Sequence, residues 1–195
     1  MPVIAAHEPA PERPFFAPIE NPLERFQQEC KANLMELSLT NGPAETAQQL
    51  VAILSTLPDG EVFVQDHPSL RALSQAAGIS RDIRWSSQGG PREVAQATIT
   101  LAEALVAQTG SIFVSAACGG RGASVVAPCH IVFANTNQLV PDLKTALSNA
   151  TKNGILAKNS YASMISGSSR TADIEKILVQ GAHGPIRLAV ILERV

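Results

Sequence analysis

From residue 22 to the end of the chain, short apolar segments alternate with longer amphipathic ones, and Gly, Pro or Asn–Gly separates them. Short apolar runs are typical of buried strands, whereas apolar residues three and four apart are typical of helices. The expected helices begin at Pro22, after Asn21 as N-cap, and cover residues 43–57, 67–77 and 140–152. The expected strands are 34–39, 61–65, 82–86, 111–115, 130–134, 161–165 and 186–192. This alternation predicts one α/β domain with a mostly parallel sheet flanked by helices.

Two other segments carry helix signals that are only local. Thr100 and Glu103 have the spacing of a capping box, which predicts a helix over residues 100–107. Residues 171–179 can also form a helix, and a strand is the alternative because residues 177–179 have no helical period.

The composition agrees with helices covering a parallel sheet. The 195 residues include only six Phe, one Trp and one Tyr, so the core must consist mainly of Ala, Val, Ile and Leu. Such a core favours helices on a parallel sheet over a sandwich with aromatic anchors. A chain of this length buries about 70% of its surface on folding, which needs no disulfide or metal.

Charge and cysteine usage exclude several classes of protein. The net charge is −2 and the basic residues are scattered without interleaved aromatics, which argues against nucleic-acid binding. No apolar run reaches the roughly 18 residues of a membrane span, and the first residues do not resemble a signal peptide. The three cysteines lack CxxC spacing and no two histidines lie three or four apart, so we expect no metal or other cofactor in this chain. These features predict a cytoplasmic protein.

The first 21 residues differ from the rest in containing five prolines and few aliphatic residues. We expect residues 1–21 to form a proline-rich arm and residues 22–195 to form the single domain. Phe15 and Phe16 could anchor the arm to a partner subunit, so a homo-oligomer is possible.

A glycine-rich loop follows the expected strand 111–115 and contains Gly119, Gly120 and Arg121. Ligands in open α/β sheets bind at the carboxyl ends of strands. Glycine N–H groups and an arginine suit a phosphate or carboxylate, so these residues are candidates for ligand binding. A plain turn is the alternative.

A second candidate anion site consists of Ser168, Ser169, Arg170 and Thr171. If a helix starts here, its first N–H groups and the hydroxyls converge on one point. The alternative is an ordinary N-cap with a surface ion pair.

Three residues are candidates for acid–base catalysis, namely Asp173, Glu175 and His183. His183 lies in a turn flanked by glycines, where an imidazole would titrate near neutral pH. On a helix the two acidic side chains diverge and cannot form a close pair, whereas on a strand they share a face.

Several motifs resemble those of the LUD-domain family. Residues 107–112 (AQTGSI) are similar to its AETGT motif, and residues 169–175 with 181–185 (SRTADIE and GAHGP) resemble its C-terminal signature. Residues 125–140 are similar to its proline–histidine strand, so the resemblance covers about residues 94–195. We therefore add Thr109 and Gly110 to the candidates for ligand binding.

The resemblance implies a fold similar to ribose-5-phosphate isomerase, glucosamine-phosphate deaminase and CoA transferases. It also implies an accessory role in the oxidation of L-lactate to pyruvate, beside partner proteins that hold iron–sulfur clusters. In that role Arg121, Ser169 and Arg170 would bind a small anionic ligand. The alternatives are a stand-alone isomerase, acyl-CoA or folate cyclo-ligase-like enzyme, and a ligand-sensing module.

The chain departs from the family motifs at three positions. Gln108 stands where the family has Glu, Ser111 replaces a threonine and Ser168 replaces a proline. Loss of the carboxylate at Gln108 argues against a general base or a covalent nucleophile at that position.

Overall fold

The computed structural model describes residues 17–89, 93–172, 178–180 and 184–195. Its centre is a six-stranded sheet in the order β1-β12-β7-β4-β2-β3, in which every neighbouring pair is parallel. The strands are β1 (Glu36–Thr40), β2 (Val62–Val64), β3 (Ile83–Trp85), β4 (Ala97–Leu101), β7 (Cys129–Asn135) and β12 (Arg187–Glu193). The predicted parallel α/β architecture is therefore confirmed.

One face of this sheet is covered by α2 (Pro43–Ser55) and α3 (Pro68–Ala76). Leu50 and Leu54 of α2 and Leu70 of α3 pack against Ile131 of the central strand. Both helices follow a strand of the sheet and begin with a proline, which tolerates the first helical position because it has no N–H to leave unpaired.

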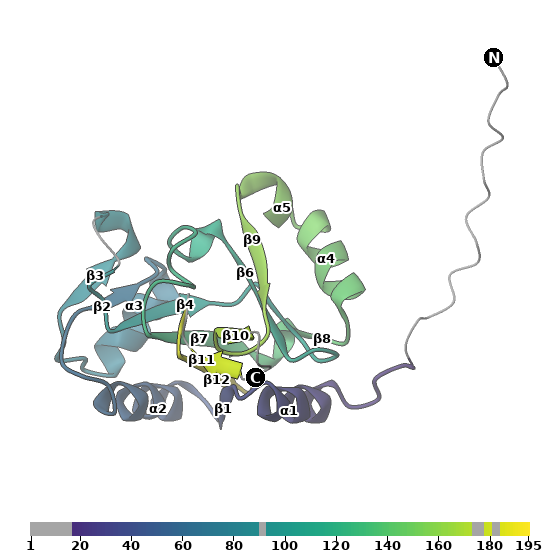
Figure 1. Ribbon diagram of the computed structural model, residues 1–195, viewed down its shortest axis with the longest axis horizontal. Coiled ribbons are helices and arrows are strands. Elements are labelled where there is room, and N and C mark those ends of the chain that lie inside the picture. Colours follow the sequence, from purple (N-terminus) through teal and green to yellow (C-terminus); the bar gives the residue numbers. More distant parts are fainter. Residues whose placement is uncertain (1–16, 90–92, 173–177, 181–183) are drawn as a thin grey trace, which may run out of the picture.

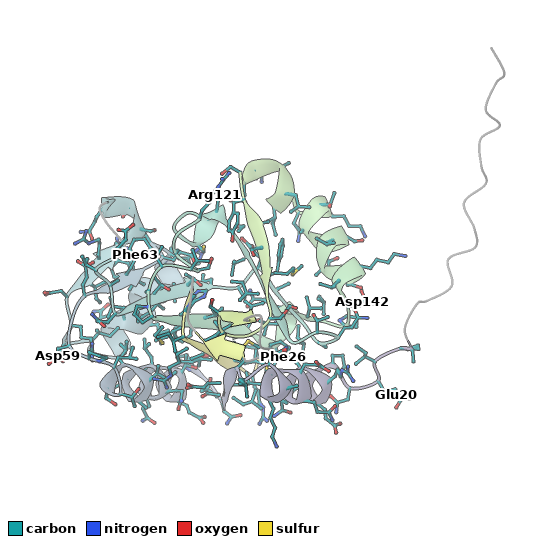
Figure 2. All side chains as sticks on the ribbon, viewed as in Figure 1. Glu20, Phe26, Asp59, Phe63, Arg121 and Asp142 are labelled. Atoms are coloured by element: carbon teal, nitrogen blue, oxygen red, sulfur yellow. The ribbon has the colours of Figure 1, made fainter. Side chains whose placement is uncertain are left out.

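The other face is covered by α1 (Pro22–Ala32) and a second sheet. Phe26 is fully buried between α1 and both sheets, and Figure 2 shows it pointing inward from the helix. The predicted N-cap is confirmed, since the Asn21 side chain accepts a hydrogen bond from the Glu24 N–H at 3.2 Å. Ile19, just before the helix, also packs against this core.

The second sheet has four strands in the order β8-β5-β6-β9 and is mostly antiparallel. Its members are β5 (Ala104–Val106), β6 (Ser111–Ser115), β8 (Leu139–Val140) and β9 (Ala162–Ile165). Its outer face packs against α4 (Leu143–Lys152) and α5 (Ile155–Lys158), which lie side by side in Figure 1. Asp142 caps α4 by accepting a hydrogen bond from the Thr145 N–H at 2.7 Å.

The helix predicted over residues 100–107 is wrong. Residues 97–101 form β4, and residues 104–106 form β5 in the second sheet. Thr98 and Thr100 are fully buried, and β4 has a strand on each side. Residues 97–101 (ATITL) alternate apolar and polar residues with the period of a strand, and the local capping pattern at Thr100 and Glu103 was misleading.

The helix predicted over residues 171–179 is also wrong where the chain is described. Residues 170–172 form β10 (Arg170–Ala172), which pairs antiparallel with β11 (Leu178–Gln180). Residues 173–177 lie outside the described part of the chain. The strand alternative is therefore the correct one at both ends of this segment. Since no described helix starts at residues 168–171, the helix N–H groups expected for the second candidate anion site are not present there.

Candidate functional site

A cavity of about 820 Å³ lies at the carboxyl edge of the parallel sheet, on the face covered by α2 and α3. Its floor contains Leu101 and Phe133, at the ends of β4 and β7, and its wall contains Leu70 and Leu73 of α3. The remaining lining residues are Pro43, Thr46, Gln65, His67, Ser69, Ala72, Ala76, Ala102, Glu103, Ala117, Ala134, Asn135, Gln138 and Glu193. This volume is within the range of small-molecule sites, which in open α/β sheets lie at this edge.

Two carboxylates line the cavity, and a hydroxyl group holds each in place. Ser115 donates a hydrogen bond to Glu103 Oε1 at 2.5 Å, and Thr46 donates to Glu193 Oε2 at 2.8 Å. The Thr46 hydroxyl lies 2.7 Å from that of Thr40, which is buried at the end of β1. Among the described residues, none donates a hydrogen bond to the second oxygen of either carboxylate.

Amide side chains close the strand ends around the cavity. Gln65, which follows β2, accepts a hydrogen bond from the Leu101 N–H at 2.8 Å and is 8% exposed. Gln138 accepts from the Asn135 N–H at 2.8 Å and donates to the Ala102 carbonyl at 2.5 Å. These bonds satisfy backbone groups at the ends of β4 and β7, next to the cavity.

The wall next to α3 is fixed by a charged cluster. His67 caps α3 by accepting a hydrogen bond from the Ser69 N–H through Nδ1 at 3.2 Å. Asp66 accepts two hydrogen bonds from Arg71, at 2.5 and 2.8 Å, and one from Ser87. The bonds from Arg71 and then Ser87 lower the pKa of Asp66 to about 2.

None of the loop residues predicted to bind a ligand, Gly119, Gly120 and Arg121, lines this cavity, although Ala117 just before them does. The strand before the loop, β6, belongs to the second sheet, so the expectation that it ends at the carboxyl edge of the parallel sheet is wrong. A Cβ on Gly119 would lie 2.8 Å from the Phe63 ring, and φ is +112° there. Arg121 is exposed at the outer end of the loop (Figure 2) and donates to the Ser160 carbonyl at 3.2 Å.

Thr109 and Gly110 form the turn between β5 and β6, against α1. Asn33 donates a hydrogen bond to the Thr109 carbonyl at 2.9 Å, and a Cβ on Gly110 would lie 2.7 Å from the Glu29 Cβ. Gln108 also lies on this side, where it lines a shallow groove with Arg25. Thr109, Gly110 and Gln108 do not line the cavity. The replacement of the family's Glu by Gln108 therefore does not change the cavity lining.

The C-terminal candidates lie partly outside the described residues. Ser169 donates its backbone N–H to the Pro185 carbonyl at 2.9 Å, and Ser168 is buried beside it. Arg170 and Thr171 belong to β10. Asp173, Glu175 and His183 fall in segments that are not described, so their catalytic roles stay predictions.

Sequence reasoning missed the cavity residues Gln65, Glu103, Asn135 and Glu193. Each lies at the end of an apolar parallel strand or within two residues after it, which is the signal that could have identified them. Glu103 was instead interpreted as part of a capping box.

No described helix is long and apolar enough to cross a membrane. The described part of the chain also has no group of three or more His, Cys, Asp or Glu side chains arranged to hold a metal ion. The polar groups that line the cavity are carboxylates, amides, hydroxyls and one imidazole.

Comparison with known proteins places the chain among named relatives. It is 27% identical to "Lactate utilization protein C" of Bacillus subtilis (strain 168), over 71% of this chain and 65% of that protein. It is 37% identical to "Lactate utilization protein C" of an Exiguobacterium species, over 48% of this chain and 42% of that protein. The chain thus spans less than two thirds of the length of these relatives.

Two other similarities extend over more of the chain. "Uncharacterized protein YkgG" of Escherichia coli (strain K12) is 23% identical over 85% of this chain and 80% of that protein. The crystal structure of a DUF162 family protein from Deinococcus radiodurans has a similar fold, with a TM-score of 0.67 and 21% identity, over 88% of this chain and 96% of that one. The family model of the LUD domain matches residues 92–192, just over half of the chain, and the chain therefore belongs to the LUD domain family.

Proposed function

We propose that this protein is a component of a lactate utilisation system and that it binds a small ligand in the cavity at the carboxyl edge of its parallel sheet. The observation that carries the role is the similarity to proteins named lactate utilization protein C in separate bacterial groups. The position of the cavity supports the proposal that a ligand binds in it, because the strand ends bring its polar groups together there.

We further propose that the electron transfer of lactate oxidation takes place in partner proteins with iron–sulfur clusters. The chemistry of the thiols supports this, because clusters are bound by cysteine thiolates. The three cysteines of this chain are buried in three different parts of the hydrophobic core, and they are Cys30, Cys118 and Cys129. Burial raises the pKa of Cys30 to about 12 and that of Cys129 to about 11, so neither forms a thiolate readily.

Growth on lactate tests the role directly. A strain without this gene should grow normally on pyruvate and fail to grow on L-lactate, because only the step from lactate to pyruvate is lost. The wild-type gene should restore growth on lactate. Equal growth of the deletion strain and its parent on L-lactate would contradict the role.

Affinity purification tests the partner proteins. A tagged copy expressed from its own promoter should retain proteins that carry iron and acid-labile sulfide, and a tagged unrelated α/β protein should not. A pure homo-oligomer, free of iron in lactate-grown cells, would contradict the part of the proposal that concerns partners.

A further inference from the structure

We propose that the cavity at the carboxyl edge of the sheet binds an organic cation and disfavours carboxylate anions such as lactate. This inference rests on the proposed ligand role of the cavity. The expected ligand is a primary amine that also carries a hydroxyl or carbonyl oxygen. The charges of the cavity are the first argument. Glu103 and Glu193 contribute two carboxylates, and no lysine or arginine is among the described lining residues. His67 is the one basic residue of that lining, and its Nδ1 is used as the cap of α3.

The two carboxylates are held ready for a ligand. Ser115 binds one oxygen of Glu103 and Thr46 binds one oxygen of Glu193, so the described residues leave one oxygen of each to a ligand. Side chains fixed in advance lose little conformational freedom when a ligand binds. An ammonium group that pairs with these oxygens forms charge-assisted hydrogen bonds, the stronger kind.

Sheet geometry sets the distance between the carboxylates. Glu193 is in register with Asn135, the last residue of β7, and β4 lies on the other side of β7. Leu101, the last residue of β4, is in register with Phe133, and Glu103 follows it by two residues. The strands that carry the two carboxylates, β12 and β4, are two strand spacings apart, or about 10 Å. One ligand of modest length can therefore reach both.

The helix N-termini at the cavity do not reverse this preference for a cation. The N-terminus of a helix attracts anions, and α2 and α3 both begin at the cavity. Glu193 and Glu45 already lie at the first turn of α2, where Thr46 holds Glu193. Asp66 precedes α3, and Pro43 and Pro68 have no N–H to offer. The first turn of α2 thus already has two carboxylates near it, and the first position of each helix has no N–H for an anion.

A buried amide indicates that the cavity is built for a polar ligand. Gln65 is more than nine-tenths buried and lines the cavity, and its Oε1 is used by the Leu101 N–H. No described residue accepts a hydrogen bond from its Nε2 group. Nε2 is not among the sealed atoms without a partner and is therefore accessible, so a ligand oxygen in the cavity can accept a hydrogen bond from it. The apolar floor at Phe133 and Leu70 suits the hydrocarbon body between the two polar ends.

Calorimetric titration of the full-length protein with matched probes tests this preference. We would use 5-amino-1-pentanol, pentane-1,5-diol, 5-hydroxypentanoate and L-lactate at millimolar concentrations and low salt. We expect the amino alcohol to bind most tightly, the diol to bind at least about tenfold more weakly, and the two carboxylates to give no heat of binding. The affinity for the amino alcohol should fall as salt is added.

Variants connect binding to the cavity. Glu103→Gln and Glu193→Gln should each weaken amino alcohol binding by about tenfold or more, because each removes one charge-assisted hydrogen bond. Glu20→Gln is the matched control, since Glu20 is exposed and lies away from the cavity (Figure 2), and it should bind like the wild type. If a cavity variant fails to fold, the salt dependence and probe order of the wild-type protein still decide the question.

Three results would overturn the inference: binding of lactate or 5-hydroxypentanoate as tight as that of the amino alcohol, equal binding of amino alcohol and diol, or no binding of any probe. The lactate growth assay is independent of this outcome. A normal growth phenotype with amine binding would remove only the lactate role, whereas a growth defect without amine binding would remove only the ligand class.

Discussion

Acid should destabilise this protein through one buried histidine. His130 lies in β7 at the centre of the parallel sheet and is 0% exposed. Its Nε2 atom lies 2.8 Å from the Thr100 hydroxyl, and Nδ1 has no hydrogen-bond partner among the described residues. Burial lowers the pKa of His130 from 6.5 to about 4, because a charged imidazole in this position loses its hydration.

The size and direction of the effect follow from that shift. Well above pH 6.5 the imidazole is neutral in both the folded and the unfolded protein, so protonation of His130 does not lower the free energy of unfolding there. As the pH falls from 6.5 to about 4, the unfolded chain binds the proton first, and the free energy of unfolding decreases. A shift of this size corresponds to about 3 kcal/mol at pH 4, which is a large part of the 5–15 kcal/mol typical of a domain.

Urea unfolding followed by circular dichroism, from pH 7 down to about pH 4, measures this contribution. His130→Gln has no titrating group and can keep the hydrogen bond to Thr100. The difference in unfolding free energy between wild type and variant should therefore change by about 3 kcal/mol over this range, since the carboxylates contribute to both. Gln48→Asn is the control, because it changes an exposed side chain of α2 that has no titrating group, and its difference should stay constant with pH.

Parallel pH profiles for wild type and His130→Gln would refute this reasoning. If the variant does not fold, the imidazole of wild-type His130 can be titrated by NMR. A pKa near 6.5 in the folded protein would equally contradict a neutral, dehydrated histidine at this position.

Three further predictions concern packing, capping and thiol chemistry. Gly119→Ala should lower the free energy of unfolding by about 2–5 kcal/mol in urea titrations, because left-handed strain adds to a clash with the Phe63 ring. Gly42→Ala is the control, since Gly42 has a similar φ and open space, and it should lower the free energy of unfolding by only about 1–3 kcal/mol. Equal losses in the two variants would exclude the clash. Asn21→Ala should cost about 1 kcal/mol and Asn21→Asp almost nothing, and a thermal melt in which both variants lose the same stability would argue against the cap. Cys30 and Cys129 should resist iodoacetamide at neutral pH until the protein is unfolded, and rapid labelling of the native protein in mass spectra would contradict their burial.

The elements that the sequence predicts correctly are those with strong local signals. The four longer helices begin at proline or at a capping Asn, His or Asp, and these starts are confirmed within one to three residues. The central strands are short apolar runs between turn residues. Propensity and hydrophobicity act within a few residues of one another, so one sequence suffices to detect them.

The second sheet was not predicted because most of its pairings join distant segments. The segment 104–106 pairs locally with 111–113, but it also pairs with 139–140, and 112–115 pairs with 162–165. No feature of residues 100–107 alone shows that they will be divided between two sheets. Tertiary contacts outweighed the capping-box pattern at Thr100 and Glu103, which is worth at most about 2 kcal/mol.

The cavity was missed for a related reason. Gln65, Glu103, Asn135 and Glu193 are up to 128 residues apart in the sequence and meet only because the strand order is β12-β7-β4-β2. The rule that ligands bind at the carboxyl ends of parallel strands directs attention to this edge of the sheet. Applying it required the order of the strands, and that order is set by packing that a single sequence does not display.

Two glycines among the predicted ligand-binding residues show why motif residues can be misinterpreted. Gly110 and Gly119 were interpreted as points where backbone approaches a ligand, and both have positive φ and no room for a Cβ. What approaches them is the chain itself: helix α1 at Gly110, and the Phe63 ring at Gly119. At these two positions glycine is required by a close neighbour as well as by left-handed backbone, and only the structure identifies that neighbour. In this fold the close approaches hold the two sheets and α1 together, while the polar groups that can bind a ligand come from strand ends without any glycine motif.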